Sequence, residues 1–234
     1  MKNKILYIIM VCALGLITMT SCESDSTAGF TRITYYPTFT LLGESTELVP
    51  VGASYTDAGV VVMEGENDIT STVITNSNVN TEEIGVYAVT YTANNVDGLP
   101  GSARRTVVVY NPEISTDISG SYTTVGETRR VSGTTETPFS DYSISISQIA
   151  PGVFYCSDYM GGYYDQRAGY GSAYAMKGYF KLNADNSIEI ISGDVAGWGD
   201  SYNYLSDAKY DAETESIYWE LGYVTFSFYI YLAK

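Results

Sequence analysis

The sequence contains no histidine, and this absence excludes several common kinds of active site. Ser-His-Asp and Cys-His catalysis both need an imidazole, as do His-ligated zinc sites. Any catalysis in this chain would have to use carboxylates, lysine or tyrosine. We therefore expect no catalytic residue and no cofactor, and the remaining enzyme class to weigh is a glycosidase built on two carboxylates.

Cysteine is also scarce, with three residues in 234. Cys12 lies in an apolar N-terminal run, Cys22 follows that run, and Cys156 stands alone in the rest of the chain. One cysteine can form neither an intramolecular disulfide nor a thiolate metal site. Cys156 ends the apolar stretch that starts at Val153, so a buried, inert thiol is expected rather than a nucleophile.

Basic residues are few, 12 against 27 acidic residues in the whole chain. Without Lys2 and Lys4 the 12 become 10, for a net charge near −17. A chain of this charge repels nucleic acid phosphates and anionic membrane surfaces, so no nucleic acid partner is expected. The acidic residues are scattered, which is typical of a solvated surface.

Long apolar runs are absent except for Ile5 to Ile17, which follows Lys2 and Lys4. This is the pattern of a signal peptide, and the run is too short for a comfortable membrane span. Cys22 stands directly after Met19-Thr20-Ser21, and this segment resembles the bacterial lipoprotein signal. The resemblance implies removal of residues 1–21 and acylation of Cys22. The alternative is ordinary secretion with an incidental cysteine.

Residues 22–31 are mostly small and polar, and they are expected to form a flexible tether. Glu23 and Asp25 resemble the export tag of outer-surface lipoproteins of the Bacteroidetes type. That resemblance implies a lipid-anchored protein of the outer membrane that faces the cell surface, although a periplasmic orientation stays open.

Residues 32–112 predict an all-β domain. Val86 to Thr92 alternates β-branched and aromatic residues, and Arg104 to Tyr110 is a second such stretch. Shorter strands between glycine-marked turns favour a small β-sandwich. The strands are expected over 33–36, 38–42, 47–50, 60–64, 69–75, 86–92 and 104–110.

An ordered set of motifs in this part resembles the bacterial Ig-like domain of some pesticidal crystal proteins and many bacterial surface proteins. The resemblance covers 33–111 and implies an immunoglobulin-like sandwich, mostly a spacer or adhesive module. Tyr87 then fits a tyrosine corner, and Val89 stands where a disulfide-bonded Ig domain would carry cysteine. The motifs are Leu42-Gly43, residues 51–59, Asn67-Asp68-Ile69-Thr70, residues 85–91 and residues 105–109.

Asp57, Asn67 and Asp68 allow two interpretations. They could be calcium ligands, but calcium needs six or more oxygens and only three side chains are in view. The favoured interpretation is that Asp57 and Asp68 accept hydrogen bonds from local backbone N–H groups in turns. No metal site is therefore predicted.

Residues 113–234 form a different unit, which begins after Asn111-Pro112 and holds 16 of the 23 tyrosines. Successive hairpins predict an antiparallel barrel or sandwich. This half resembles the C-terminal domain of two-domain Bacteroidetes surface lipoproteins, a resemblance that brings no catalytic residues. The strands are expected over 119–126, 142–149, 153–157, 173–182, 187–192, 216–221 and 224–232.

Two long loops, 158–171 and 193–207, interrupt these strands, with the hairpin 173–182/187–192 between them. A hairpin returns the chain to the end where it started, so the two loops should meet. Trp198 lies in the second loop, whereas Trp219 lies in a strand and is expected in the core. The residues predicted to bind a ligand are Tyr163, Tyr164, Asp165, Arg167, Trp198, Asp200, Tyr202 and Tyr204.

Aromatic faces match the C–H faces of sugars, and carboxylates, amides and guanidinium match sugar hydroxyls. The expected function is therefore capture of a polysaccharide or oligosaccharide beside an outer-membrane uptake system. The alternative is a structural or adhesive surface module with no small-molecule site, in which the tyrosines only cover the end of the domain. A glycosidase using two of Asp158, Asp165, Asp194 and Asp200 needs a carboxylate spacing that sequence cannot supply.

Overall fold

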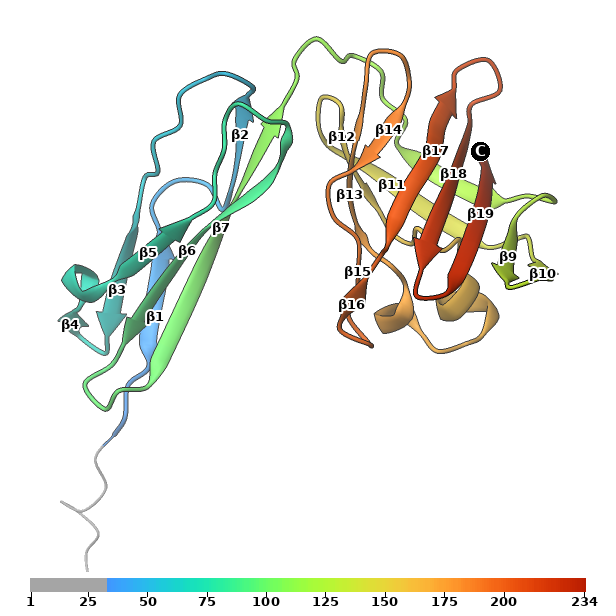
Figure 1. The fold of residues 1–234 in the computed structure, drawn as a ribbon. Coiled ribbons are helices and arrows are strands. Elements are labelled where there is room, and N and C mark those ends of the chain that lie inside the picture. Colours follow the sequence, from blue (N-terminus) through green and yellow to red (C-terminus); the bar gives the residue numbers. More distant parts are fainter. Residues whose placement is uncertain (1–32) are drawn as a thin grey trace, which may run out of the picture. The chain divides into compact units, whose positions relative to one another are not determined.

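The computed structural model describes residues 33–234 (Figure 1). The predicted signal peptide, the predicted acylation site at Cys22 and the predicted tether up to residue 31 lie outside the described residues. Within the described part, no helix has the length and apolar content needed to cross a membrane.

The first domain contains two sheets. One sheet has the order β1 (Pro37–Leu41), β3 (Val60–Glu64) and β4 (Asn67–Asp68). The other has the order β2 (Thr46–Pro50), β7 (Pro100–Tyr110), β6 (Gly85–Asn94) and β5 (Ile74–Ser77), and β2 runs parallel to β7. Inward-facing valines of both sheets, with Tyr91, make the core. This is the predicted Ig-like sandwich, and Val89, at 1% exposure, packs in that core.

Tyr87 forms the predicted tyrosine corner. Its hydroxyl donates a hydrogen bond to the carbonyl oxygen of Glu83, at 2.9 Å. The ring lies over Gly85, where an added Cβ would stand about 3.0 Å from the ring atoms, so glycine allows the close approach. The second domain repeats the device with Tyr122, whose hydroxyl donates to the carbonyl oxygen of Ile118 at 2.7 Å.

The first core also contains an ion pair that sequence reasoning did not find. Arg105 is fully buried, and its Nη1 lies 2.6 Å from Oδ1 of Asp57. The hydroxyls of Tyr91 and Tyr55 donate to the same carboxylate, at 2.7 and 3.0 Å. Although burial disfavours the charge, these hydrogen bonds and the Arg105 cation lower the pKa of Asp57 below its ordinary value.

The turn interpretation of the two aspartates is confirmed. Oδ2 of Asp57 accepts a hydrogen bond from the N–H of Gly59 at 3.0 Å, and Asp68 accepts one from Thr70 at 2.8 Å. Across residues 33–234, no group of three or more acidic or cysteine side chains could hold a metal ion.

The second domain is a ten-stranded, antiparallel, curled sheet. Strand β18 pairs with both β17 and β19, and a single bridge between Ser187 and Lys209 links the two sides of the curl. The hairpin β15 (Asp194–Val195) and β16 (Asp200–Ser201) forms a separate two-stranded sheet, and a bridge joins its Asp194 to Lys177, just before β13. The ten strands are β8 (Gly120–Thr124), β9 (Arg129–Ser132), β10 (Thr135–Pro138), β11 (Ser143–Ala150), β12 (Val153–Cys156), β13 (Gly178–Leu182), β14 (Ile188–Ile190), β17 (Tyr204–Asp211), β18 (Ser216–Tyr223) and β19 (Phe226–Ala233).

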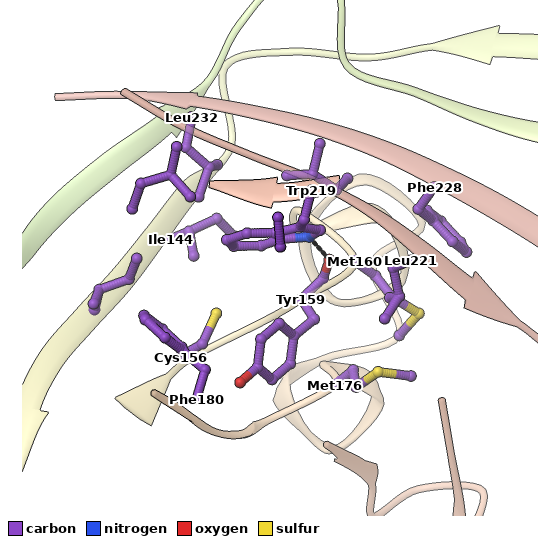
Figure 2. Close-up of a cluster of buried hydrophobic side chains, with 14 of the residues drawn as sticks. Ile144, Cys156, Tyr159, Met160, Met176, Phe180, Trp219, Leu221, Phe228 and Leu232 are labelled. Carbon is purple, nitrogen blue, oxygen red and sulfur yellow. Dashed lines mark hydrogen bonds between the residues drawn. The ribbon is translucent and has the colours of Figure 1, made fainter. Parts of the chain in front are cut away.

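Trp219 is at the centre of the second core, as predicted (Figure 2). Its Nε1 donates a hydrogen bond to the carbonyl oxygen of Tyr159 at 2.8 Å, and the two rings meet edge to face at 5.6 Å. Phe154 and Phe180, in the same cluster, stack on each other with ring centroids 5.4 Å apart. Cys156 lies in the same cluster without exposure, and burial raises the pKa of its thiol, which fits the predicted inert role.

Several predicted strand limits are wrong. Residues 33–36 form no strand, and within 69–75 the segment Thr70–Thr72 is a 3₁₀ turn, η1. Ser172–Tyr174 is another 3₁₀ turn, η3, so β13 begins only at Gly178 rather than at 173. The hairpin β9–β10 was not predicted, and no limits were predicted for β17, which forms a hairpin with β18. β17 begins at Tyr204, inside the segment predicted as a loop.

Candidate ligand-binding site

The first long loop joins β12 to β13, and one buried carboxylate holds its two ends. Oδ1 of Asp158 accepts hydrogen bonds from the N–H groups of Met160 and Met176, at 2.9 and 3.0 Å. Oδ2 accepts one from Gly162 at 2.9 Å. Burial raises the pKa of Asp158 to about 7, while the three backbone hydrogen bonds act in the opposite direction.

A single π-helical turn, η2 (Tyr163–Arg167), follows this clamp. Gly162 precedes it at φ 79°, in the left-handed region that glycine adopts without strain. The turn directs Tyr163 and Tyr164 inward, and both rings are buried. Tyr163 packs edge to face on Phe139 at 5.1 Å and on Phe228 at 5.6 Å. Two of the predicted ligand residues are therefore mainly core residues.

The second long loop contains the β15–β16 hairpin, with Trp198 in its turn. The N–H of Gly197 donates to the carbonyl oxygen of Ala173, in the first loop, at 2.7 Å. A Cβ at Gly197 would lie 2.7 Å from the ring of Tyr174, so this contact requires glycine. The two loops therefore meet, as predicted.

Three partly exposed rings from these loops surround a depression of about 310 Å³, which we name the aromatic cup: Tyr170, Tyr174 and Trp198. Trp198 is 42% exposed and Tyr170 is 57% exposed. The ring of Trp198 is inclined at 63° to Tyr174, with centroids 4.9 Å apart, and at 87° to Tyr170, at 6.3 Å. The rings are thus walls of a hollow and do not form one flat surface.

Buried aromatic rings support the aromatic cup from below. Tyr164 meets Trp198 edge to face at 4.9 Å, and Tyr223 stacks on Trp198 at 6.0 Å. The Tyr223 hydroxyl donates to Asp200, at 2.9 and 3.0 Å from its two carboxylate oxygens. Burial, and then this carboxylate, raise the pKa of Tyr223. The predicted residues Tyr164, Trp198 and Asp200 therefore lie together around the aromatic cup.

Tyr204 and Tyr202 lie elsewhere, which corrects the predicted grouping. Tyr204 belongs to β17, where its ring covers Gly222 and its hydroxyl donates to Oε1 of Glu220 at 2.8 Å. Because neighbouring residues of a strand face opposite sides of the sheet, Gly222 and Tyr204 lie on the side away from the buried Tyr223. Tyr202 is partly buried against the core.

Tyr174 is a cup residue that sequence reasoning missed, because it fell inside a predicted strand. The glycines at 169 and 171 were the available signal, since they favour an irregular turn over a continuous strand. Tyr170 belongs to the predicted loop but was not selected there. Asp165 is partly buried beside Tyr164.

Arginine side chains surround Tyr163. The guanidinium carbon of Arg167 lies 4.9 Å from the ring centre, and that of Arg130 lies 4.7 Å from it. Arg130 also lies 4.6 Å from the ring centre of Phe226. Arg167, one of the predicted ligand residues, therefore contacts Tyr163, which in turn contacts Tyr164 below the aromatic cup.

Comparison with known proteins gives matches over both domains. A family model for a C-terminal domain matches residues 111–234, and the family described as "Bacterial surface protein, Ig-like domain" matches residues 39–109. These are the two parts for which the sequence predicted such resemblances, and both are confirmed. No curated protein matches the chain.

Two solved structures are informative to different degrees. The crystal structure of the lipoprotein BT2262 from Bacteroides thetaiotaomicron is 36% identical, with a TM-score of 0.50, over 85% of this chain and 100% of that chain. A Clostridium perfringens ZmpB structure, described as CBM51-2 in complex with GlcNAc and INT domains, is 17% identical over 51% of this chain and 31% of that chain. Its TM-score is 0.29, so this second likeness carries no argument.

Proposed function

This chain belongs to the family of the lipoprotein BT2262 from Bacteroides thetaiotaomicron, and on that basis we propose that it is a surface lipoprotein of the outer membrane that binds glycans. The lipid on Cys22 supplies the membrane attachment. The Ig-like domain is a spacer, and the second domain presents the aromatic cup. An outer-membrane uptake system is the partner that would receive the bound polysaccharide or oligosaccharide.

The observation that carries the glycan assignment is the aromatic cup. Exposed tryptophan and tyrosine rings are costly to leave in water and suit the C–H faces of sugar rings. The rings of Tyr170 and Tyr174 are inclined at 74° to each other, and both are steeply inclined to Trp198. This arrangement suits a single sugar ring that stacks on one aromatic face while the edge of the sugar contacts the other two aromatic rings. A flat crystalline polysaccharide would need rings in a common plane.

The support below the aromatic cup favours a preformed site. Trp198 contacts Tyr164, Tyr174 and Tyr223, and Gly197 is hydrogen-bonded across to the other loop. A site whose side chains are already ordered loses little conformational freedom on binding. The shallow hollow still offers a limited contact area, so we expect modest affinity for a single sugar and higher affinity for an oligosaccharide.

We propose binding without catalysis. Asp158 is buried and its oxygens accept three backbone hydrogen bonds, so it does not present a free carboxylate to a glycosidic bond. Asp200 accepts the Tyr223 hydroxyl. The net charge near −17 also supports a partner other than nucleic acid.

The test is a glycan array with residues 22–234, made soluble by Cys22→Ser, followed by calorimetry on the best ligand. We expect Trp198→Ala to lower the affinity by about tenfold or more, as for other aromatic anchors. Tyr204→Ala is the matched control, because Tyr204 is 41% exposed but lies outside the aromatic cup. Equal affinity losses in the two variants contradict the proposed site, and an array without any binding favours the structural or adhesive module.

A further inference from the structure

Two arginines of this acidic chain, Arg130 and Arg167, contact the same aromatic ring, that of Tyr163. Three of the six arginines, Arg129, Arg130 and Arg167, lie in β9 and η2. Arg129 has a carboxylate partner, with its Nε 3.5 Å from Oε2 of Glu136, and its guanidinium covers Tyr229. Arg130 and Arg167, in contrast, have no carboxylate partner among the described residues.

Arg130 is held by aromatic groups. Its guanidinium carbon lies 4.7 Å from the ring centre of Tyr163 and 4.6 Å from that of Phe226. Its Nε is buried and has no hydrogen-bond partner among the described residues. A buried donor without a partner is unfavourable, and the two aromatic contacts of the guanidinium offset part of this cost.

Arg167 is exposed, and its guanidinium lies 4.9 Å from the same Tyr163 ring. The two guanidinium groups are therefore within about 10 Å of each other, since both lie within 5 Å of one ring centre. Neither makes a salt bridge with a carboxylate anywhere in residues 33–234, Asp165 included. Acidic residues outnumber basic ones by 27 to 12, so two neighbouring cations without an acidic partner are unexpected.

These cations lie next to the aromatic cup. Tyr163 contacts Tyr164 at 5.0 Å, and Tyr164 contacts Trp198 at 4.9 Å. A guanidinium presents a planar set of N–H donors that matches the oxygens of a carboxylate or a sulfate. These contacts place both guanidinium groups within about 15 Å of the Trp198 ring, a span that an oligosaccharide of a few units stacked on Trp198 can cover.

We propose that Arg130 and Arg167 form an anion subsite beside the aromatic cup, and that the glycan carries carboxylate or sulfate groups. This inference rests on the proposed glycan-binding function and narrows its ligand class. The net charge near −17 disfavours long polyanions, so the ligand is a short acidic oligosaccharide or an acidic branch of a larger glycan.

The experiment measures binding of three sets of oligosaccharides of equal length to residues 22–234 carrying Cys22→Ser. Oligogalacturonides carry carboxylates only, carrageenan oligosaccharides carry sulfates only, and manno- and cello-oligosaccharides are neutral. We expect one acidic set to bind more tightly than the neutral sets. Arg167→Gln and Arg130→Gln should each weaken that binding by about ten- to hundredfold, as expected for loss of a charged hydrogen bond.

Arg104→Gln is the matched control, because it removes the same charge from an exposed position in β7. Arg167 is also exposed, so its variant tests the subsite even if the half-buried Arg130 variant folds poorly. The inference is overturned if no acidic set binds, or if acidic binding is equal in Arg167→Gln and Arg104→Gln. If only the neutral oligosaccharides bind, and Trp198→Ala abolishes that binding, then the proposed glycan-binding function is supported but the anion subsite is refuted. Absence of binding by all sets removes both.

Discussion

The two tryptophans of this chain should respond to substitution in opposite ways. Trp219 is fully buried and hydrogen-bonded, whereas Trp198 is 42% exposed at the aromatic cup. Truncating a large buried aromatic to alanine costs about 3–5 kcal/mol. Trp219→Ala also leaves the buried carbonyl oxygen of Tyr159 without its donor, which adds about 1 kcal/mol or more. We therefore expect a loss of at least about 4 kcal/mol, a large part of the 5–15 kcal/mol typical of a domain.

Trp198→Ala should cost far less. Its ring contacts Tyr164, Tyr174 and Tyr223, and each aromatic pair contributes about 0.5–1.5 kcal/mol beyond burial. Exposure and rearrangement of the loop reduce that sum, so we expect about 1–2 kcal/mol. Trp219→Phe is an intermediate control that keeps a ring but loses the N–H donor.

The assay is urea unfolding followed by tryptophan fluorescence, with circular dichroism for Trp219→Ala. Because the chain has two tryptophans, Trp198→Ala leaves fluorescence from Trp219 alone, which should be blue-shifted when folded and red-shifted when unfolded. If Trp198→Ala destabilises the domain as much as Trp219→Ala, then Trp198 is a core residue. The aromatic cup would in that case be a packing feature, and its exposed rings would not be evidence for a ligand.

Three further predictions concern the clamp, the anchor and the domain boundary. Burial raises the pKa of Asp158 from 3.8 to about 7, so the folded state holds this proton more tightly than the unfolded state. The resulting contribution to the free energy of unfolding is fully present below pH 3.8 and is lost as the pH rises to about 7. The melting temperature of wild type minus that of Asp158→Asn should therefore fall between about pH 4 and 7, and a constant difference would contradict the shifted pKa. Cys22→Ser should abolish labelling with palmitate and release the protein from the membrane fraction; continued labelling of the variant would refute the anchor. Residues 32–112 and 113–234 should each unfold cooperatively in isolation, as measured by calorimetry, and an unfolded fragment would indicate a shared core.

Local sequence patterns were enough to predict most of the fold. The alternation in Val86–Thr92 predicted a strand, and the resemblance to the Ig-like family predicted the tyrosine corner at Tyr87. Both features depend on residues close in sequence. The hairpin between the two long loops predicted that the loops meet, which follows from chain geometry alone. Trp219 was correctly predicted in the core from its position in an apolar strand.

The missed features depend on contacts between distant residues. Arg105 and Asp57 are 48 residues apart, and nothing near either of them indicates that they form a buried pair. Arg104 and Arg105 are adjacent in a strand, so alternation predicts that one of them faces the inside of the domain. Alternation does not predict which residue pairs with it. Tyr204 was predicted in a loop because β17 is irregular, with a register shift between Ser206 and Lys209. Its position over Gly222 depends on pairing with a strand that follows later in the chain.

The hydrogen bonds of Asp158 determine which part of the first long loop is free to vary. One side chain fixes Met160 and Gly162 at the start of the first long loop and Met176 at its end. The two ends of the segment between Gly162 and Met176 are therefore held together by hydrogen bonds to one carboxylate. The exposed part of this segment, beyond the buried Tyr163 and Tyr164, can therefore change its side chains while the carboxylate still holds both ends of the loop.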